Sequence, residues 1–532
     1  MTILPREDEW RRFFRNLRYV VVDELHYYGG LFGAHVALVM RRLRRICCAI
    51  GNDQVRFISC SATIANPVEH MQNLFGIDDV VLVDEDGSPS GRKEHVVWNP
   101  RLNDPDDPRQ GRVSTITETS RIFRFLMDRG VRCIVFCKVR IFCELLMKQV
   151  RADLMEQGRG DVAQRVMAYR SGYSAADRRQ IERDMFSGQL LGIVSTTALE
   201  LGVDIGSLDA VLTVSFPYTL PGLRQQAGRA GRRQKDSLSM LVCGPFPLDQ
   251  HFARNPAELW TAPFSKVAFD LGNPIVLEGH VQCAAKEMPI EAGDGQYFGD
   301  DLPRICAEQL VADDEGFWHA NPSWGFNPAK LVSLRASEEG SYTVVDVTGG
   351  KTDVLEELET SRAIFTTYEG AVYHHQARTF VVKRMDHDAK IAHVQRATIN
   401  YQTRSRDFTN VDPVDTLAAR EIAGSSFAAA YGTIKIESVI FGYFKLDRRN
   451  NILDTVDVYS PSFVRSSHGM WVDVPARALE ILVAKGFHLA GAIHAAEHAV
   501  LSLSPVVAMS TEGDIKTECK VSQAGLGYFY IK

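Results

Sequence analysis

The segment YVVVDELH, residues 19–26, decides the fold class of this chain. Its apolar, β-branched run ends at Asp23 and Glu24, which is the pattern of a strand followed by a polar loop. Carboxylates just past the carboxyl end of a parallel strand lie in the crevice where α/β folds bind nucleotides. In phosphoryl transfer, the first acid would hold Mg²⁺ through its water shell and the second would orient the attacking water. Because a solvated turn can carry the same pair, the interpretation depends on the surrounding segments.

Short β-branched runs alternate with longer helical stretches from Leu17 to Gly244, as expected for a parallel α/β sheet. The expected strands are 18–22, 55–59, 132–137, 191–195, 210–214 and 238–243. The polar, proline-rich stretch 99–112 divides them into two groups and is typical of an interdomain linker. We therefore predict two parallel-sheet α/β lobes, one over 1–105 and one over 112–247.

Beyond Gly244 the pattern changes to one that predicts α+β accessory and C-terminal domains. Helical segments over 264–271 and 276–286 precede a region of short alternating strands, 331–399. One strong helix is expected near 475–504. The expected modules are a winged-helix-like module over 255–335, a mainly β module over 336–410 and a partial C-terminal domain over 415–532.

The composition excludes several classes of protein. With 532 residues, 45% of them hydrophobic, the chain is long enough for several cores and for roughly three or four domains. Its 10 cysteines include no C-x-x-C pair, which gives neither a disulfide framework nor a zinc knuckle. No uninterrupted run reaches the ~20 apolar residues of a membrane span, and an apolar signal core is absent, so we predict an intracellular protein without a membrane partner. The net charge of −6 requires that any DNA contact come from a local basic groove.

Hydroxyl side chains follow the second expected strand, in the sequence VRFISCSAT. Ser61 and Thr63 stand about one βα unit after the acidic pair, where short hydroxyls can bridge that pair to a neighbouring lobe. A serine or threonine after a strand is usually a helix N-cap. The order and spacing after DELH favour the bridging role.

A second hydroxyl pair begins the sequence STTALELGVDIG. Thr196 and Thr197 follow a strand and can hold a nucleic-acid phosphate. Gly202 and Asp204 crowd the next turn, where the acid can reach a ribose or lock an arginine and so contribute to nucleotide binding. In isolation the segment also fits an ordinary glycine-rich β-turn.

The sequence LRQQAGRAGRR, residues 223–233, gathers basic residues at one short helix. Arginines three apart lie on one helical face, so Arg229 and Arg232 suit a γ-phosphate across a domain cleft, together with Gln225. A solvated or nucleic-acid-facing surface is the common alternative. The paired glycines favour close approach of a ligand.

Together, these segments resemble motifs II, III, V and VI of superfamily 2 helicases in order and separation. The sequences YRSGYSAADRRQIERDMFSG (169–188), SRAIFTTYEGAVYHHQ (361–376) and HAAEHAVLSLSPVVAM (494–509) resemble the Hrq family of RecQ-like DNA helicases, relatives of human RecQ-like helicase four. The resemblance covers nearly the whole chain, and it implies that the two lobes are RecA-like, with an incomplete first lobe over 1–105 and a complete second lobe over 112–247.

The resemblance implies an ATP- and Mg²⁺-dependent helicase that steps 3′ to 5′ along single-stranded and forked DNA in nuclear DNA repair, including the repair of interstrand crosslinks. It implies Asp23 and Glu24 at the Mg²⁺ and the catalytic water, and Thr196 at the DNA backbone. It also implies that Ser61 and Thr63 couple ATP hydrolysis to motion along DNA. Three residues of the second lobe would reach the phosphates of ATP: Gln225, Arg229 and Arg232.

The sequence departs from this family at both termini. A phosphate loop, G-x-x-x-x-G-K-[ST], is needed ahead of DELH, yet the 22 residues before Asp23 contain no glycine. The G-K-T at 350–352 lies far after the last motor motif and has Val345 where the loop's first glycine belongs. The family's cysteine-rich zinc subdomain is not found either, since Cys519 alone follows Cys306. These departures predict a chain truncated at both ends that, by itself, binds ATP weakly and shows no DNA-stimulated hydrolysis.

Other functions stay open at the level of sequence. The HAAEH segment, with His494, Glu497 and His498, fits the H-x-x-E-H pattern of inverted zinc proteases, but its surroundings are typical of a packed amphipathic helix. An RNA helicase fragment and a nucleic-acid-binding scaffold without ATPase activity are the alternatives to a DNA helicase. The motor motifs do not separate DNA from RNA.

Overall fold

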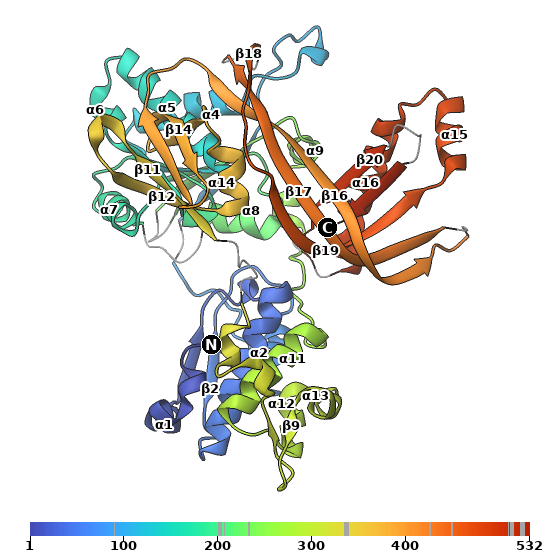
Figure 1. Ribbon diagram of the computed structural model, residues 1–532. Coiled ribbons are helices and arrows are strands. Elements are labelled where there is room, and N and C mark those ends of the chain that lie inside the picture. The colour runs from blue at the N-terminus through green and yellow to red at the C-terminus, as the bar shows by residue number, and fades with distance from the viewer. Residues whose placement is uncertain are drawn as a thin grey trace.

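The computed structural model of this protein has two parallel-sheet lobes and three accessory modules (Figure 1). The structure describes residues 1–89, 91–200, 205–206, 208–231, 235–334, 340–424, 427–447, 451–508, 510, 515–521 and 527–531. The two lobes lie one above the other in Figure 1, with the accessory modules beside them. The predicted α/β class with α+β accessory domains is confirmed.

The first lobe has a two-stranded parallel sheet with helices on one face. Its elements are α1 (Glu7–Asn16), β1 (Tyr19–Val22), α2 (Gly30–Ala49), β2 (Arg56–Ser59) and α3 (Pro67–Phe75). Val20 pairs with Phe57, and Val22 is buried in the cluster that α2 and α3 cover. Tyr19, Val21 and Ile58 are exposed. The lobe thus buries only one face of its sheet.

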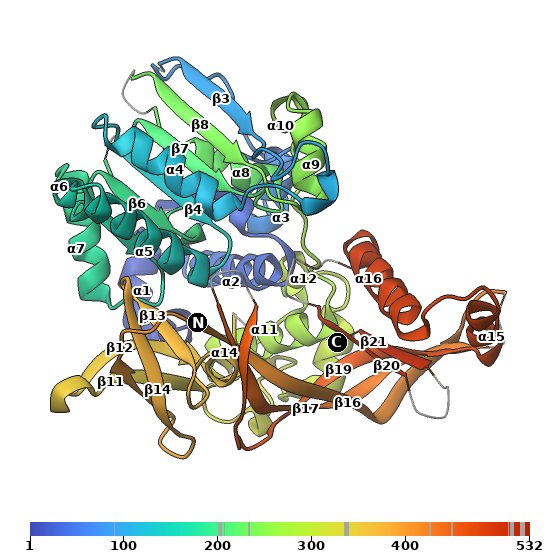
Figure 2. The ribbon, with the colours of Figure 1, turned by 90° about the horizontal axis from the view of Figure 1, so that it is seen from above.

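The second lobe has a six-stranded, all-parallel sheet in the order β3-β8-β7-β4-β6-β5. The strands are β3 (Lys93–Trp98), β4 (Cys133–Cys137), β5 (Val166–Tyr169), β6 (Gly192–Ser195), β7 (Ala210–Val214) and β8 (Ser237–Val242). The helices are α4 (Thr115–Met127), α5 (Arg140–Glu156), α6 (Gly160–Ala163), α7 (Ala175–Phe186), α8 (Leu220–Ala227), α9 (Pro247–Arg254) and α10 (Glu258–Thr261). Right-handed crossovers put α4 and α5 on one face and α7 and α8 on the other, so every residue of β4 and β7 is buried (Figure 2).

The expected boundary between the lobes was wrong. Strand β3 lies within the predicted first lobe, 1–105, yet it pairs with β8 at the edge of the second sheet. The stretch 99–112 therefore does not link two lobes, because it connects β3 to α4 inside the second one. The Trp98 indole N–H donates to the Glu118 carboxylate on α4 at 3.0 Å, which fixes β3 there. The chain crosses between the lobes before Lys93.

A small helical module packs against the first lobe (Figure 1). It contains α11 (Pro274–Glu287), α12 (Gly295–Phe298), α13 (Leu302–Gln309) and a hairpin of β9 (Val311–Ala312) and β10 (Trp318–His319). The helix expected over 276–286 is present, but the one over 264–271 is not. That segment is extended: the backbone carbonyl of Ala268 accepts from Gly30 at 2.9 Å, and Phe269 packs on the first lobe. Burial of its apolar side chains against another domain overrode the local helical pattern.

A mainly β module follows and packs against the second lobe. Its five strands have the order β12-β11-β15-β14-β13, with one helix, α14. The bounds are β11 (Ser341–Asp346), β12 (Asp353–Glu359), α14 (Thr360–Thr366), β13 (Val372–His375), β14 (Arg378–Asp386) and β15 (Ile391–Arg396). Arg170 of the second lobe forms a buried ion pair with Glu356 of β12. The G-K-T at 350–352 lies in the turn between antiparallel β11 and β12, which is not the strand-loop-helix setting of a phosphate loop.

The last module is an antiparallel sheet with two helices. Its sheet has the order β16-β17-β19-β21-β20, with β18 paired to β17. The bounds are β16 (Gln402–Glu421), β17 (Ala428–Leu446), β18 (Ile452–Asp457), β19 (Phe463–Val474), α15 (Ala476–Ala484), α16 (Leu489–Val507), β20 (Thr517–Val521) and β21 (Gly527–Ile531). The expected gap between modules at 410–415 falls inside β16 and was wrong, since β16 pairs with β17 along its whole length.

The single helix expected near 475–504 is instead α15 and α16, which meet at an angle of 120°. The chain turns at Gly486, whose φ of 71° favours glycine, and the His488 imidazole caps α16 by accepting from the Gly491 N–H. Among the described residues no helix alone has the length and apolar character of a membrane span, although this bent pair meets both criteria when its helices are taken together.

Candidate active site

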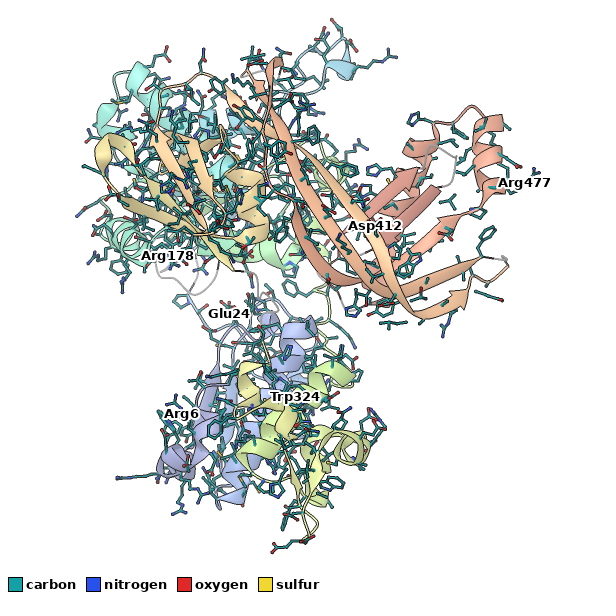
Figure 3. The ribbon with its side chains drawn as sticks, in the orientation of Figure 1. Arg6, Glu24, Arg178, Trp324, Asp412 and Arg477 are labelled. Atoms are coloured by element: carbon teal, nitrogen blue, oxygen red, sulfur yellow. The ribbon has the colours of Figure 1, made fainter. Side chains whose placement is uncertain are left out.

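The acidic pair lies where β1 ends, at the junction of the two lobes (Figure 3). Because β2 runs parallel to β1, Cys60 comes next to Asp23, and its thiol donates to the Asp23 carboxylate at 2.9 Å. The Glu24 N–H donates to the same oxygen at 2.8 Å. These hydrogen bonds, the thiol's first, hold the pKa of Asp23 below its usual value. Asp23 is therefore an exposed, ionised carboxylate.

Glu24 has a left-handed backbone, with φ of 52°. A residue with a Cβ adopts this conformation at a cost, and such strain gathers at functional sites. The conformation turns the chain into the short helix Leu25–Tyr27, where buried Leu25 donates its N–H to the Cys60 carbonyl at 2.9 Å. This anchor fixes the backbone that carries both acidic residues against the end of β2.

His26 and Gln225 connect the two lobes. The His26 Nδ1 lies 2.9 Å from the Ser61 hydroxyl, and its Nε2 hydrogen-bonds with the Gln225 amide on α8. The same amide nitrogen donates to the Thr63 hydroxyl at 3.2 Å. Burial lowers the pKa of His26, which fits a neutral ring whose Nε2 accepts from Gln225 while Nδ1–H donates to Ser61. Two of the predicted residues, Ser61 and Gln225, thus contact His26, a residue for which the sequence had given no role, and Thr63 joins them through Gln225.

The structure describes only part of the arginine-rich segment 223–233. Arg229 is 7% exposed and donates its Nε–H to the Glu200 carbonyl at 2.9 Å, so its guanidinium is held within the second lobe. The neighbouring Gln226 amide also binds Glu200, through its carboxylate, at 3.2 Å. Three other predicted positions, Gly202, Asp204 and Arg232, lie outside the described residues.

A basic cavity of about 310 Å³ opens at the carboxyl edge of the second sheet. Its side chains follow successive parallel strands, with one arginine added from α14 of the β module. The lining residues are Lys138, Val139, Arg140, Ser171, Thr196, Thr197, Ala198 and Arg362. Burial and the nearby charge of Arg140 lower the pKa of Arg362. With three cations and no carboxylate in its lining, the cavity is suited to an anion.

An apolar pocket of about 630 Å³ adjoins this cavity and shares Lys138 with it. Tyr218 and Phe246 are 54% and 59% exposed there, and the Lys138 ammonium lies 3.9 Å from the centroid of the Tyr218 ring. Exposed aromatic faces beside a basic groove suit the stacking of unpaired bases. The sequence analysis missed these aromatics, although both belong to proline-containing loops, FPY and PFP, that directly follow strands.

Three family matches follow the chain in order. The family described as DEAD/DEAH box helicase matches residues 1–71, and the helicase conserved C-terminal domain matches residues 116–234. The family described as ATP-dependent helicase HRQ1, winged helix domain, matches residues 269–337, which overlaps the segment 255–335 predicted to be winged-helix-like.

Curated relatives extend these matches. The chain is 45% identical to ATP-dependent helicase HRQ1 of Saccharomyces cerevisiae over 98% of its own length and 49% of that protein. It is 32% identical to the uncharacterized ATP-dependent helicase YprA of Bacillus subtilis, over 99% of its own length and 69% of that protein. The chain belongs to the Hrq1 family of superfamily 2 helicases. It spans about half the length of the yeast relatives that it matches.

Among solved structures, the Hrq1-family fold of this chain is similar to the DUF1998 helicase MrfA bound to DNA. The TM-score is 0.87 at 29% identity, over 100% of this chain and 70% of that one. MrfA bound to both DNA and AMPPNP gives a TM-score of 0.84. The family that the motifs indicated is confirmed, and so is the architecture of lobes with accessory domains.

Proposed function

We propose that this chain is the motor region of an ATP-dependent DNA helicase that moves 3′ to 5′ on single-stranded DNA, opens forked DNA and acts in DNA repair in the nucleus. The observation that carries the proposal is the contact of Gln225 with His26 and Thr63. It joins the second lobe to the loop that bears the acidic pair. A change at the nucleotide would therefore reach the surface where a strand binds.

The acidic pair supplies the hydrolytic half of this function. Asp23 keeps its charge and points away from the core, so it fits a Mg²⁺ held through water. When bound, Mg²⁺ would neutralise the developing charge on the phosphates of ATP. Glu24, fixed beside it, would orient the attacking water. We assign a phosphate contact to Arg232, and also to Arg229 once it leaves the Glu200 carbonyl. Gly202 and Asp204 would border the same nucleotide.

The basic cavity and the aromatic pocket supply the binding half. Thr196 and Thr197 would donate to one backbone phosphate, whose charge Arg140 and Arg362 would neutralise. Tyr218 would stack on a neighbouring base. The similarity to MrfA bound to DNA supports this path for the DNA strand. That relative and this chain share the arrangement of lobes that forms the carboxyl edge of the second sheet, where the basic cavity lies.

The first experiment tests strand binding. Arg362→Ala should weaken binding to single-stranded DNA about equally for all sequences and reduce the magnitude of the salt slope of log K by about 0.7, the value for one lost phosphate contact on a single strand. Thr196→Val should weaken binding without changing sequence preference. Arg384→Ala is the matched control, because Arg384 is an exposed arginine of the same β module that pairs with Asp386. Equal losses in Arg362→Ala and Arg384→Ala would contradict the assigned path.

The second experiment tests coupling in a version of the protein that carries a phosphate loop ahead of β1. Gln225→Ala should lower DNA-stimulated ATP hydrolysis roughly 10-fold or more, equal to about 1.4 kcal/mol in the barrier, and leave DNA affinity nearly unchanged. Glu24→Gln should abolish turnover while nucleotide binding persists. Gln180→Ala is the control, since Gln180 is an exposed glutamine that binds Asp184 on its own helix. Full activity in Gln225→Ala would refute the coupling role.

Direction and nucleic-acid type need separate assays. Duplexes with a 3′ tail should be unwound and those with a 5′ tail should not. In competition, single-stranded DNA should displace a bound strand more effectively than RNA of equal length. Preference for RNA would replace the DNA helicase by the RNA helicase alternative. Strand binding without any hydrolysis in the protein with its phosphate loop would support the scaffold alternative.

A further inference from the structure

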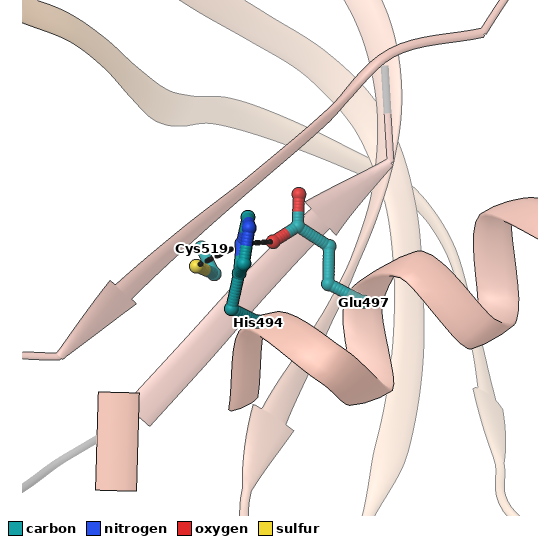
Figure 4. Close-up of side chains that lie close together, drawn as sticks. All are labelled: His494, Glu497 and Cys519. Carbon is teal, nitrogen blue, oxygen red and sulfur yellow. Dashed lines mark hydrogen bonds and ion pairs between the residues drawn. The ribbon is translucent and has the colours of Figure 1, made fainter. Parts of the chain in front are cut away.

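Three possible metal ligands of three different kinds meet in the C-terminal module (Figure 4). His494 and Glu497 lie one turn apart on α16, and Cys519 lies on β20, which packs against that helix. One ligand atom from each residue lies within 4.8 Å of the other two. The His494 Nδ1 is 3.1 Å from a Glu497 carboxylate oxygen and 3.5 Å from the Cys519 sulfur. Donors around a tetrahedral Zn²⁺, with bonds of about 2.0–2.3 Å, stand roughly 3.3–3.8 Å apart.

Glu497 is the residue whose buried carboxylate a bound cation would stabilise most. It is 2% exposed, and of the described residues only His494 forms an ion pair with it. A buried carboxylate is costly unless a positive charge or several donors compensate it. A divalent ion between the three ligand atoms would supply that charge while replacing the present contacts.

The geometry separates this set from the H-x-x-E-H arrangement of inverted zinc proteases. In that arrangement both histidines bind the metal. Here His498 approaches His494 from the other side, with 3.2 Å between the two Nε2 atoms, while the Nδ1 of His494 faces Glu497 and Cys519. His498 is thus an outer partner that orients the ring of His494, as second-shell groups do in metal sites.

We propose that His494, Glu497 and Cys519 supply three ligands of a tetrahedral Zn²⁺ site that joins α16 to β20, with a water molecule as the fourth ligand. The mixture of imidazole, carboxylate and thiolate matches the borderline softness of Zn²⁺ better than that of Mg²⁺ or Ca²⁺, which take oxygen ligands. The site joins two elements of the C-terminal module and lies outside the motor, so it is independent of the proposed helicase function.

The test is metal content and spectroscopy of the full chain, with Zn²⁺ and Co²⁺ as probes. The chain should hold one tightly bound Zn²⁺, and His494→Ala and Cys519→Ser should each lose it. His498→Ala should weaken binding by roughly 10–100-fold without removing the ligand set. Cys48→Ser is the matched control, because Cys48 is another cysteine that is not buried, and it should keep full zinc content.

The cobalt spectrum needs no variant and therefore does not depend on how well a variant folds. The Co²⁺-loaded chain should show a thiolate-to-metal charge-transfer band, and the band should persist in Cys48→Ser and His498→Ala. Its absence from the unaltered chain would overturn the proposal. So would complete loss of zinc in His498→Ala, or zinc content in Cys519→Ser equal to that of the unaltered chain.

Discussion

The two lobes bury their parallel sheets in opposite ways. In the second lobe, helices cover both faces and leave β4 and β7 without any exposed residue. In the first lobe, helices cover one face, and on the other Tyr19, Val21 and Ile58 are 58%, 65% and 49% exposed. Parallel sheets are stable when both faces are covered. The first lobe must therefore gain stability from outside its own sheet, and the second need not.

The small helical module of α11 to α13, which the HRQ1 winged helix family matches, supplies part of that stability. Arg42 of α2 and Glu287 of α11 form an ion pair with both side chains fully buried, and Arg45 pairs with Asp294 at 2.8 Å. His35 and His280 approach to 3.0 Å beside them. Buried apolar residues of α2 share a cluster with those of α11 and α13. The first lobe and this module thus share a core, although their sequences are more than two hundred residues apart.

The largest expected effect breaks this shared core. Arg42→Met leaves Glu287 buried and unpaired, so we expect a loss of about 3–5 kcal/mol in the free energy of unfolding of the first lobe with its module. Chemical denaturation monitored by hydrogen exchange in β1, β2 and α11 would measure it. The double substitution Arg42→Met with Glu287→Leu should recover most of the loss. If it recovers nothing, the pair is not what joins the two parts.

The next effect compares equivalent strand positions in the two lobes. Leu212→Ala, in the buried centre of β7, should cost about 2–5 kcal/mol, because it leaves a cavity. Val21→Ala, on the exposed face of β1, should cost less than about 0.5 kcal/mol. Urea denaturation of both variants measures the difference. Similar losses would mean that another part of the protein covers the exposed face of β1 and β2.

A smaller effect tests where the second lobe begins. Trp98→Phe removes the hydrogen bond from the indole to Glu118 and should cost about 0.5–1.5 kcal/mol. Because β3 belongs to the second sheet, hydrogen exchange should rise in β8 and α4 and stay unchanged in β1 and β2. Faster exchange in β1 and β2 instead would show that β3 belongs to the first lobe.

The smallest effect concerns the contact between the lobes and its pH dependence. Burial lowers the pKa of His26, so the folded state holds this ring neutral and binds fewer protons than the unfolded chain. The contribution of His26 to stability is complete above its unfolded pKa of about 6.5 and falls as the pH drops below that value. The melting temperature should fall more steeply between pH 7 and 5 than in His26→Gln. Parallel profiles would show that the ring is not buried neutral in solution.

The sequence located the strand ends that carry chemistry more reliably than the boundaries between domains. All six predicted strands exist, and Ser61, Thr63 and Gln225 do gather at one place. Their patterns are local, since each is an apolar run followed by a polar turn. Strands β3 and β5 were not predicted, and the hydrophobic run of β3 was assigned to the wrong lobe. The residues of a strand do not by themselves determine which sheet edge the strand pairs with.

By itself, the sequence determined the class of fold, the family and the residues at the carboxyl ends of strands, because periodicity and short motifs depend on neighbours along the chain. Only the tertiary structure decided that His26 joins the two lobes, that Arg362 of a β module completes a basic cavity, and that Cys519 meets His494 and Glu497. Each of these contacts joins residues that are distant in the chain. Such contacts arise from the packing of whole elements, which no local pattern specifies.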